Sequence, residues 1–153
     1  MAKQQKTSIE NKCGGCTLCC KLLEIKEINK PANQLCTDCI LNKGCGIYKD
    51  KPQSCTDFQC AYYQMDKVSK DLRPENCKVI FEKVSGHIFF GTQDPDFPMT
   101  EVAIKQIGSF NREGYSVVIA TKDRKDIFLA QNHTPKQIKK DFNQYLREKY
   151  GRT

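Results

Sequence analysis

The second half of the chain alternates between apolar and polar segments in a way that predicts regular secondary structure. Two apolar runs, residues 79–81 and 87–90, flank Gly86 and predict a β-hairpin. Residues 115–120 and 126–130 are joined across a charged turn and predict a second hairpin. We therefore expect four strands that form a small antiparallel sheet.

Two segments of helical period accompany these strands. Apolar side chains recur at helical spacing through residues 99–110, and Gly114 is placed to end this helix. A second and clearer helix follows Thr134, a capping residue, and begins with Pro135. Its apolar stripe comprises Ile138, Phe142, Tyr145 and Leu146. The pattern predicts an α+β fold in which two helices pack on the sheet.

The first half of the chain shows no comparable period and is dominated by cysteine. Residues 1–12 are polar and indicate a flexible arm. Of the ten cysteines in the chain, the nine that cluster are Cys13, Cys16, Cys19, Cys20, Cys36, Cys39, Cys45, Cys55 and Cys60. We predict that residues 13–65 form a metal-binding lobe, here called the cysteine lobe. We expect residues 66–153 to form the α+β portion and to pack with the lobe as one compact domain.

The spacing of the clustered cysteines is typical of metal ligation. Three Cys-x-x-Cys steps occur, two of which share Cys16, and such steps let two thiolates converge from one tight turn. Cys19 and Cys20 are adjacent, so their side chains diverge and serve one tetrahedral ion poorly. We expect two centres or one polynuclear cluster. Eight thiols would fill two four-thiolate sites, and bridging sulfurs would let nine hold three ions.

A disulfide framework is the competing interpretation, because ten cysteines is an even number. The chain begins without the apolar core of a secretory signal, and no later run is long enough to span a membrane. We therefore expect a cytoplasmic protein whose thiols stay reduced. The apolar content of 39% is low for a globular chain, so metal ligation is expected to supply much of the stability of the lobe.

Charge does not identify a macromolecular partner. The formal net charge is +7, but nine thiolates would turn it into −2 before any metal charge is added. The basic balance is thus partly a counter-charge for the cysteines. A zinc module that binds nucleic acid stays a minor alternative, because the lobe lacks interleaved basic and aromatic residues.

The order of residues in the first half resembles a known family. The matching motifs are Cys13-Gly-Gly-Cys16-Thr-Leu-Cys19-Cys20, Lys30-Pro31-Ala32, Cys36-x-x-Cys39, Gly44-Cys45-x-Ile47-Tyr48 and Pro52-x-x-Cys55-x-x-Phe58-x-Cys60. They resemble the bacterial CxxCxxCC cysteine-cluster family, often called the YkgJ family of zinc- or iron-chelating proteins. The resemblance covers about the first half of the chain.

What the resemblance implies is metal chelation in a bacterial cytosol, without a single reaction or substrate. One relative is a flagellin lysine methylase, but this chain has no glycine-rich nucleotide fingerprint that would support such a reaction. Two positions depart from the family pattern: Lys51 and Thr56 stand where the family usually has arginine. A role of those arginines in binding an anion is therefore not implied here.

Several other residues are assigned ordinary roles. Tyr48 and Phe58 are expected to shield the thiolates from solvent, and Cys77 to be a buried cysteine rather than a tenth ligand. His87 and His133 are expected to have ordinary polar roles, since a lone histidine without spaced partners is seldom a ligand. Asp94 and Asp96 are interpreted as turn residues in a proline-containing loop. We identify no catalytic constellation, so whether the protein is an enzyme is left open.

The sequence thus favours a protein that holds two or more zinc ions through clustered thiolates, for structure, storage or delivery. An iron–sulfur redox protein is the alternative, since both metals accept clustered thiolates. The fourth cysteine of a ferredoxin site is normally followed by proline, and none of the later clustered cysteines is. This absence favours zinc modestly.

Overall fold

The computed structural model describes residues 16–40, 44–47, 50, 52–58, 60–64 and 70–151. Residues 1–12, Cys13 and Tyr48, for which the sequence made predictions, lie outside these ranges. The elements of the first half are α2 (Leu18–Leu22), η1 (Lys26–Ile28), β1 (Cys39–Ile40), β2 (Gly44–Cys45), α3 (Gln53–Asp57), α4 (Ala61–Gln64), η3 (Lys70–Leu72) and α5 (Pro74–Cys77). Those of the second half are β3 (Val79–Ser85), β4 (Ile88–Gln93), α6 (Glu101–Arg112), β5 (Ser116–Thr121), β6 (Arg124–Phe128) and α7 (Pro135–Tyr150).

The α+β class is confirmed, with one correction to the sheet. Strands β3 to β6 form a single sheet in chain order, and both predicted hairpins, β3–β4 and β5–β6, are antiparallel. The central pair β4–β5 is parallel, so the sheet is mixed rather than wholly antiparallel. The reason is α6, which lies between β4 and β5 in the sequence. This helix returns the chain to the end of the sheet at which β4 begins, so β5 runs parallel to β4.

One face of the sheet packs against α6. Phe89 stacks on Phe110 with ring centroids 3.9 Å apart, and Phe81 meets the same ring edge-on. Thr100 caps the helix by accepting a hydrogen bond from the Ala103 amide, and Gly114 follows the helix with a positive φ of 95°. The predicted second-half helix and its end are therefore confirmed.

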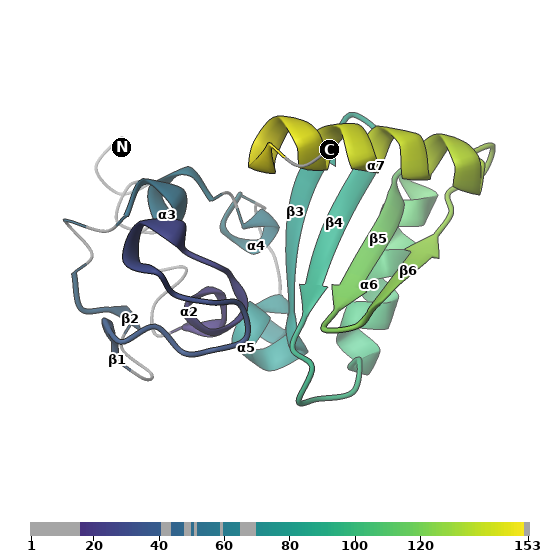
Figure 1. Ribbon diagram of the computed structural model, residues 1–153. Coiled ribbons are helices and arrows are strands. Elements are labelled where there is room, and N and C mark those ends of the chain that lie inside the picture. Colours follow the sequence, from purple (N-terminus) through teal and green to yellow (C-terminus); the bar gives the residue numbers. More distant parts are fainter. Residues whose placement is uncertain are drawn as a thin grey trace, which may run out of the picture.

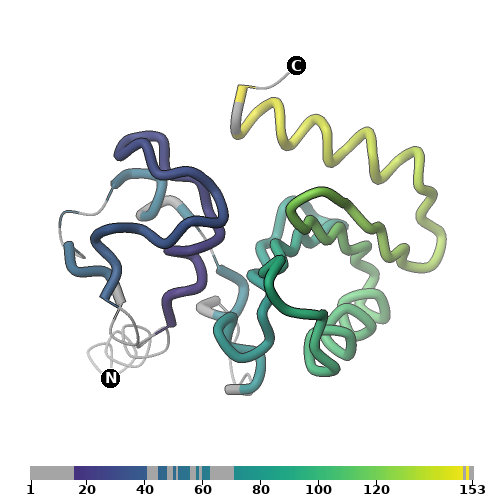
Figure 2. The backbone as a smooth tube through the Cα atoms, turned by 60° about the horizontal axis from the view of Figure 1, so that its bottom comes forward, coloured from purple at the N-terminus to yellow at the C-terminus, as the bar shows by residue number. Residues whose placement is uncertain are grey.

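The opposite face packs against α7, as the two views in Figures 1 and 2 show. The predicted stripe lies on this face: Ile138 and Phe142 are buried against Ile88 and Val118, and Tyr145 and Leu146 pack beside them. Thr134 accepts a hydrogen bond from the Gln137 amide and Gly151 ends the helix in the left-handed conformation. Successive side chains of β4 and β5 point to opposite faces of the sheet, so each face offers an apolar surface to one helix.

The cysteine lobe lies beside the β3 edge of the sheet (Figure 1). Leu18 and Leu22, four residues apart on α2, are buried together with Ile80 of β3. Phe58, Cys16, Cys19 and Cys60 pack around these three side chains. No helix among the described residues has both the length and the apolar character needed to cross a membrane. The lobe is thus anchored to the sheet by a small apolar contact.

Candidate metal centre

Helix α2 presents two of the clustered cysteines at the inner side of the lobe. Because Leu18 and Leu22 bind the helix to Ile80, the intervening Cys19 and Cys20 are held at fixed positions. Cys19 packs against the same apolar cluster, and Cys20 makes side-chain hydrogen bonds with both Cys19 and Cys39 of β1. The two adjacent side chains therefore contact each other, so the expectation that Cys19 and Cys20 diverge is wrong.

Backbone contacts bring the next group of cysteines to α2. The Cys36 amide donates to the Cys20 carbonyl at 2.9 Å, and the Cys39 amide donates to the Cys36 carbonyl at 3.1 Å, which closes the predicted Cys-x-x-Cys turn. The short hairpin β1–β2 then pairs Cys39 with Cys45. Residues from three segments of the sequence thus meet at one place.

Gly46 is required directly after this hairpin. Its amide donates to the Asp38 carbonyl at 2.7 Å, and a β-carbon added to Gly46 would lie only 2.8 Å from that same oxygen. A larger residue would therefore push the two chain segments apart. The position of Cys45 relative to Cys39 depends on this close approach.

Helix α3 adds Cys55 and is tied to the rest of the lobe by Glu27. The carboxylate of Glu27 in η1 accepts hydrogen bonds from the Ser54 amide and hydroxyl, at 2.9 and 2.7 Å. These bonds satisfy an amide in the first turn of α3 and lower the pKa of Glu27. They fix the end of the helix from which Cys55 projects.

The thiols are close enough to influence one another electrostatically. A hydrogen bond with Cys19, burial and the charge of Cys19 all raise the pKa of Cys20. Burial and the charge of Cys20 raise the pKa of Cys39 to about 11. Burial, followed by the charges of Cys20, Cys45 and Cys36, raises the pKa of Cys55. These cysteines therefore stay protonated at neutral pH unless a cation compensates their charge.

A buried lysine, for which no function was predicted from the sequence, lies among these thiols. Lys30 is only 6% exposed and donates hydrogen bonds to the carbonyls of Lys21 and Leu23, at the C-terminal end of α2. Burial lowers the pKa of Lys30, while the charges of Cys36, Cys20, Cys19 and Cys55 oppose that shift. Its ammonium group thus supports the helix and faces the thiols. The only sequence signal was its place in the Lys-Pro-Ala motif.

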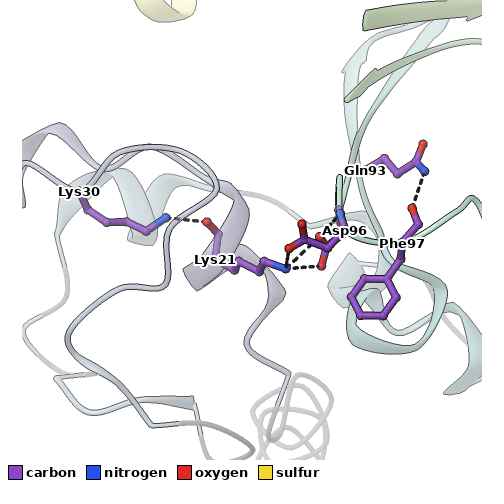
Figure 3. Close-up of polar contacts among 6 residues, drawn as sticks. Lys21, Lys30, Gln93, Asp96 and Phe97 are labelled. Atoms are coloured by element: carbon purple, nitrogen blue, oxygen red, sulfur yellow. Dashed lines mark hydrogen bonds and ion pairs between the residues drawn. The ribbon is translucent and has the colours of Figure 1, made fainter. Parts of the chain in front are cut away.

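Lys21 connects the lobe to the α+β portion (Figure 3). Its ammonium group lies 2.9 Å from both carboxylate oxygens of Asp94 and 2.7 Å from Oδ2 of Asp96. The Asp96 amide also donates to Asp94 Oδ1 at 3.0 Å, so the predicted turn role of these aspartates is confirmed. Their second role, holding Lys21, was not predicted.

The remaining cysteines differ in their surroundings. Cys77 is fully buried, with its sulfur 3.3 Å from the Val79 carbonyl and 3.4 Å from that of Leu72, and its prediction as a buried cysteine is confirmed. Cys16 and Cys60 pack against the apolar cluster of α2. None of the nine described cysteines forms a disulfide.

The donor chemistry of this lobe fits zinc or iron, because clustered thiols are the ligands that both metals accept. The coordination geometry is not formed: within the described ranges, no three Cys, His, Asp or Glu side chains are grouped so that they could hold one ion. Cys13, the first predicted ligand, lies outside those ranges. The structure therefore brings Cys20, Cys36 and Cys39 together without defining a ligand set.

Comparison with known proteins adds no identification. No protein-family model, curated protein or solved structure matches the chain. The resemblance to the CxxCxxCC family therefore stays a prediction that rests on the cysteine motifs.

Proposed function

We propose that this protein binds metal ions through the thiolates of the cysteine lobe, and that these ions are zinc, two or more per chain. The observation that carries the proposal is the approach of Cys20 on α2 to Cys36 and Cys39, which lie together in one Cys-x-x-Cys turn of another segment. A shared ion gives such a meeting a chemical purpose, because thiols alone gain little from contact with one another.

The electrostatics of the lobe support the same proposal. Thiols whose pKa values are raised by burial and by neighbouring sulfur are unfavourable as thiolates, and a bound divalent cation reverses this by removing their protons. The apolar core of the lobe is small, since the buried apolar side chains among its described residues, apart from cysteine, are Leu18, Leu22, Ile25, Ala61 and Tyr62. Metal ligation would supply the missing stability. The role would be structural, or storage or delivery of the ion.

Zinc is proposed ahead of an iron–sulfur cluster on chemical grounds. It needs no sulfide and tolerates bridging thiolates, so it can use more cysteines than one four-iron cluster requires. Lys30 is compatible with either centre, because a tetrathiolate site carries excess negative charge that a buried ammonium group offsets.

The test is metal analysis of the full chain purified without oxygen, together with its absorption spectrum and its acid-labile sulfide. We expect a colourless protein with at least two zinc ions per chain. The Cys39→Ser variant should lose zinc, whereas Cys77→Ala, which removes a cysteine outside the cluster, should retain it. A brown protein with iron and sulfide in similar amounts would show that the lobe holds an iron–sulfur cluster and not zinc. Wild-type protein without bound metal after reconstitution would end the proposal.

A further inference from the structure

The only two histidines of the chain lie close together, although they are 46 positions apart in the sequence and no contact between them was predicted. His87 lies in the turn between β3 and β4, and His133 lies in the loop before α7. Their ring centroids are 5.7 Å apart, with an angle of 73° between the ring planes. The parallel pairing of β4 with β5 produces this meeting, because it sets Ser116 beside Ile88, next to His87, and the Ser116 amide donates to the His87 carbonyl at 2.9 Å.

Each ring is oriented by a partner at one of its nitrogens. His87 Nε2 lies 2.8 Å from Oδ2 of Asp141 on α7, and His133 Nδ1 lies 2.6 Å from the hydroxyl of Ser116. Within the described residues, no hydrogen-bond partner is present at the other two nitrogens, His87 Nδ1 and His133 Nε2. One nitrogen of each imidazole is thus fixed and the other is left for a ligand.

A catalytic use of Ser116 does not fit this arrangement. The residue is fully buried, and its hydroxyl oxygen already accepts the Ala130 amide at 2.9 Å besides contacting His133. A nucleophile must reach its substrate, and this hydroxyl cannot. Its position matches the outer partner of a metal-binding histidine, which orients the ring by contacting the nitrogen that does not bind the ion. Asp141 stands in the same relation to His87.

The spacing of the two rings is consistent with one shared ion. Zinc–imidazole bonds are about 2.0–2.1 Å, so two rings on one ion have centroids roughly 4.6–6.5 Å apart for coordination angles from about 90° to 180°. The observed separation of 5.7 Å falls inside that range. Side-chain exposure of 39% for His87 leaves the ion a route from solvent.

We propose that His87 and His133 form a metal site separate from the cysteine lobe, which binds one first-row divalent ion such as Zn²⁺, Ni²⁺ or Cu²⁺ through His87 Nδ1 and His133 Nε2. Imidazole nitrogens suit these ions, in contrast to the soft thiolates of the lobe. No third Cys, His, Asp or Glu side chain among the described residues joins the pair, so water completes the coordination. The ion is therefore exchangeable, and it links the β3–β4 turn to the loop that starts α7.

The test is a Ni²⁺ titration of the full-length ¹⁵N-labelled protein, first supplied with Zn²⁺ until the lobe takes up no more and then freed of unbound and exchangeable Zn²⁺ by gel filtration. Paramagnetic Ni²⁺ broadens imidazole signals, and each signal belongs to one of only two histidines. We expect both to broaden at the same Ni²⁺ concentration. His133→Gln should raise the concentration that broadens His87 at least about tenfold, in line with the cost of weakening a metal site. Backbone signals from α2 report the lobe separately, so the result does not depend on whether the lobe binds zinc.

Controls distinguish ligation from packing. His133→Phe keeps a ring against His87 but has no nitrogen, so it should abolish the joint response as His133→Gln does. If one of the two variants fails to fold, the other still tests the proposal. Lys136→Gln, an exposed change in the first turn of α7, should leave the response unchanged. The proposal is overturned if the two imidazoles respond at independent concentrations. It is equally overturned if the variants that lack the His133 nitrogens respond like the wild type, or if no broadening occurs at millimolar Ni²⁺.

Discussion

The contact of Lys21 with Asp94 and Asp96 predicts how strongly the lobe is held to the sheet. Asp94 has a side-chain exposure of 2%, whereas that of Asp96 is 68%. Replacement of Lys21 by methionine keeps most of the length of the side chain but leaves the Asp94 carboxylate buried beside an apolar group. We therefore expect Lys21→Met to loosen α2 from the sheet, chiefly through Asp94.

The magnitude follows from burial. Exposed ion pairs contribute about 0.2–1 kcal/mol, and loss of one partner of a buried pair costs about 3–5 kcal/mol. The pair with Asp94 is bidentate and has one buried partner, but Lys21 keeps 26% exposure, so water reduces its strength. We expect a coupling free energy of about 2–3 kcal/mol between Lys21 and Asp94, which lies between these limits.

A double-mutant cycle of Lys21→Met and Asp94→Asn measures this coupling. Asparagine keeps an oxygen that can accept the Asp96 amide, so the turn is retained while the charge is lost. Urea unfolding and hydrogen exchange of the α2 amides provide the free energies. If the two changes prove additive within error, the ion pair does not hold the lobe, and the Leu18–Leu22–Ile80 contact must do so alone.

Asp96 is the internal control for this cycle. Hydrogen bonding and charge from Lys21 lower the pKa of Asp96, so its stabilising effect is complete above the ordinary carboxyl pKa and is lost as the pH falls through the lowered value. Asp96→Asn should accordingly matter less than Asp94→Asn at neutral pH, and its effect should vanish in acid. An effect of Asp96→Asn that persists in acid would contradict the charge argument.

Three further outcomes are expected from the same structure. If metal is bound by the lobe, a chelator or acid should remove hydrogen-exchange protection from α2 before it does so from β3–β6; simultaneous loss would contradict a separate metal-dependent lobe. Lys30→Met should weaken retention of metal against a chelator about tenfold or more, because the carbonyls of Lys21 and Leu23 and the nearby thiolates lose their ammonium partner. The exposed change Lys26→Met should have no effect, and equal retention by both variants would show that Lys30 is not part of the centre. Gly91→Ala should lower the free energy of unfolding by about 1–3 kcal/mol, because the added carbon would lie 2.4 Å from Ile119 Cδ1. Gly86→Ala is the control, since a carbon added there meets nothing within 4 Å, and equal urea midpoints of the two variants would refute this packing argument.

The α+β half was predictable because local signals agree there with the tertiary structure. Thr134 followed by Pro135 starts α7, and alternating apolar residues form β4 and β5. The error was the direction of β4 relative to β5. Two hairpins can be joined with their central strands parallel or antiparallel, and the choice depends on where α6 packs. That information lies in the contacts of Phe89 with Phe110, which no local pattern reveals.

The candidate site was predictable only as a set of residue types. Cys-x-x-Cys spacing anticipated the Cys36–Cys39 turn, because the chemistry is local. Lys30 was missed, since a single lysine in a polar stretch resembles many solvated lysines, and its burial depends on the carbonyls at the end of α2. The partners of Lys21 were missed for the same reason: Asp94 is a turn residue locally and an ion-pair partner only after the lobe docks on the sheet.

The contacts of Lys21 and Lys30 join these observations, because they connect the proposed metal centre with the fold. Lys30 holds the carbonyl end of α2 from the side of the thiols, and Lys21, on the last turn of the same helix, holds Asp94 at the end of β4 (Figure 3). A change in the charge of the cysteines therefore acts first on Lys30, and α2 is the rigid element through which it reaches the sheet. Since the apolar contact of Leu18 and Leu22 with Ile80 is small, we expect this polar connection to contribute to docking of the lobe when its thiols change state. We therefore expect loss of metal to change the structure around α2 first, and to reach the rest of the molecule through this helix.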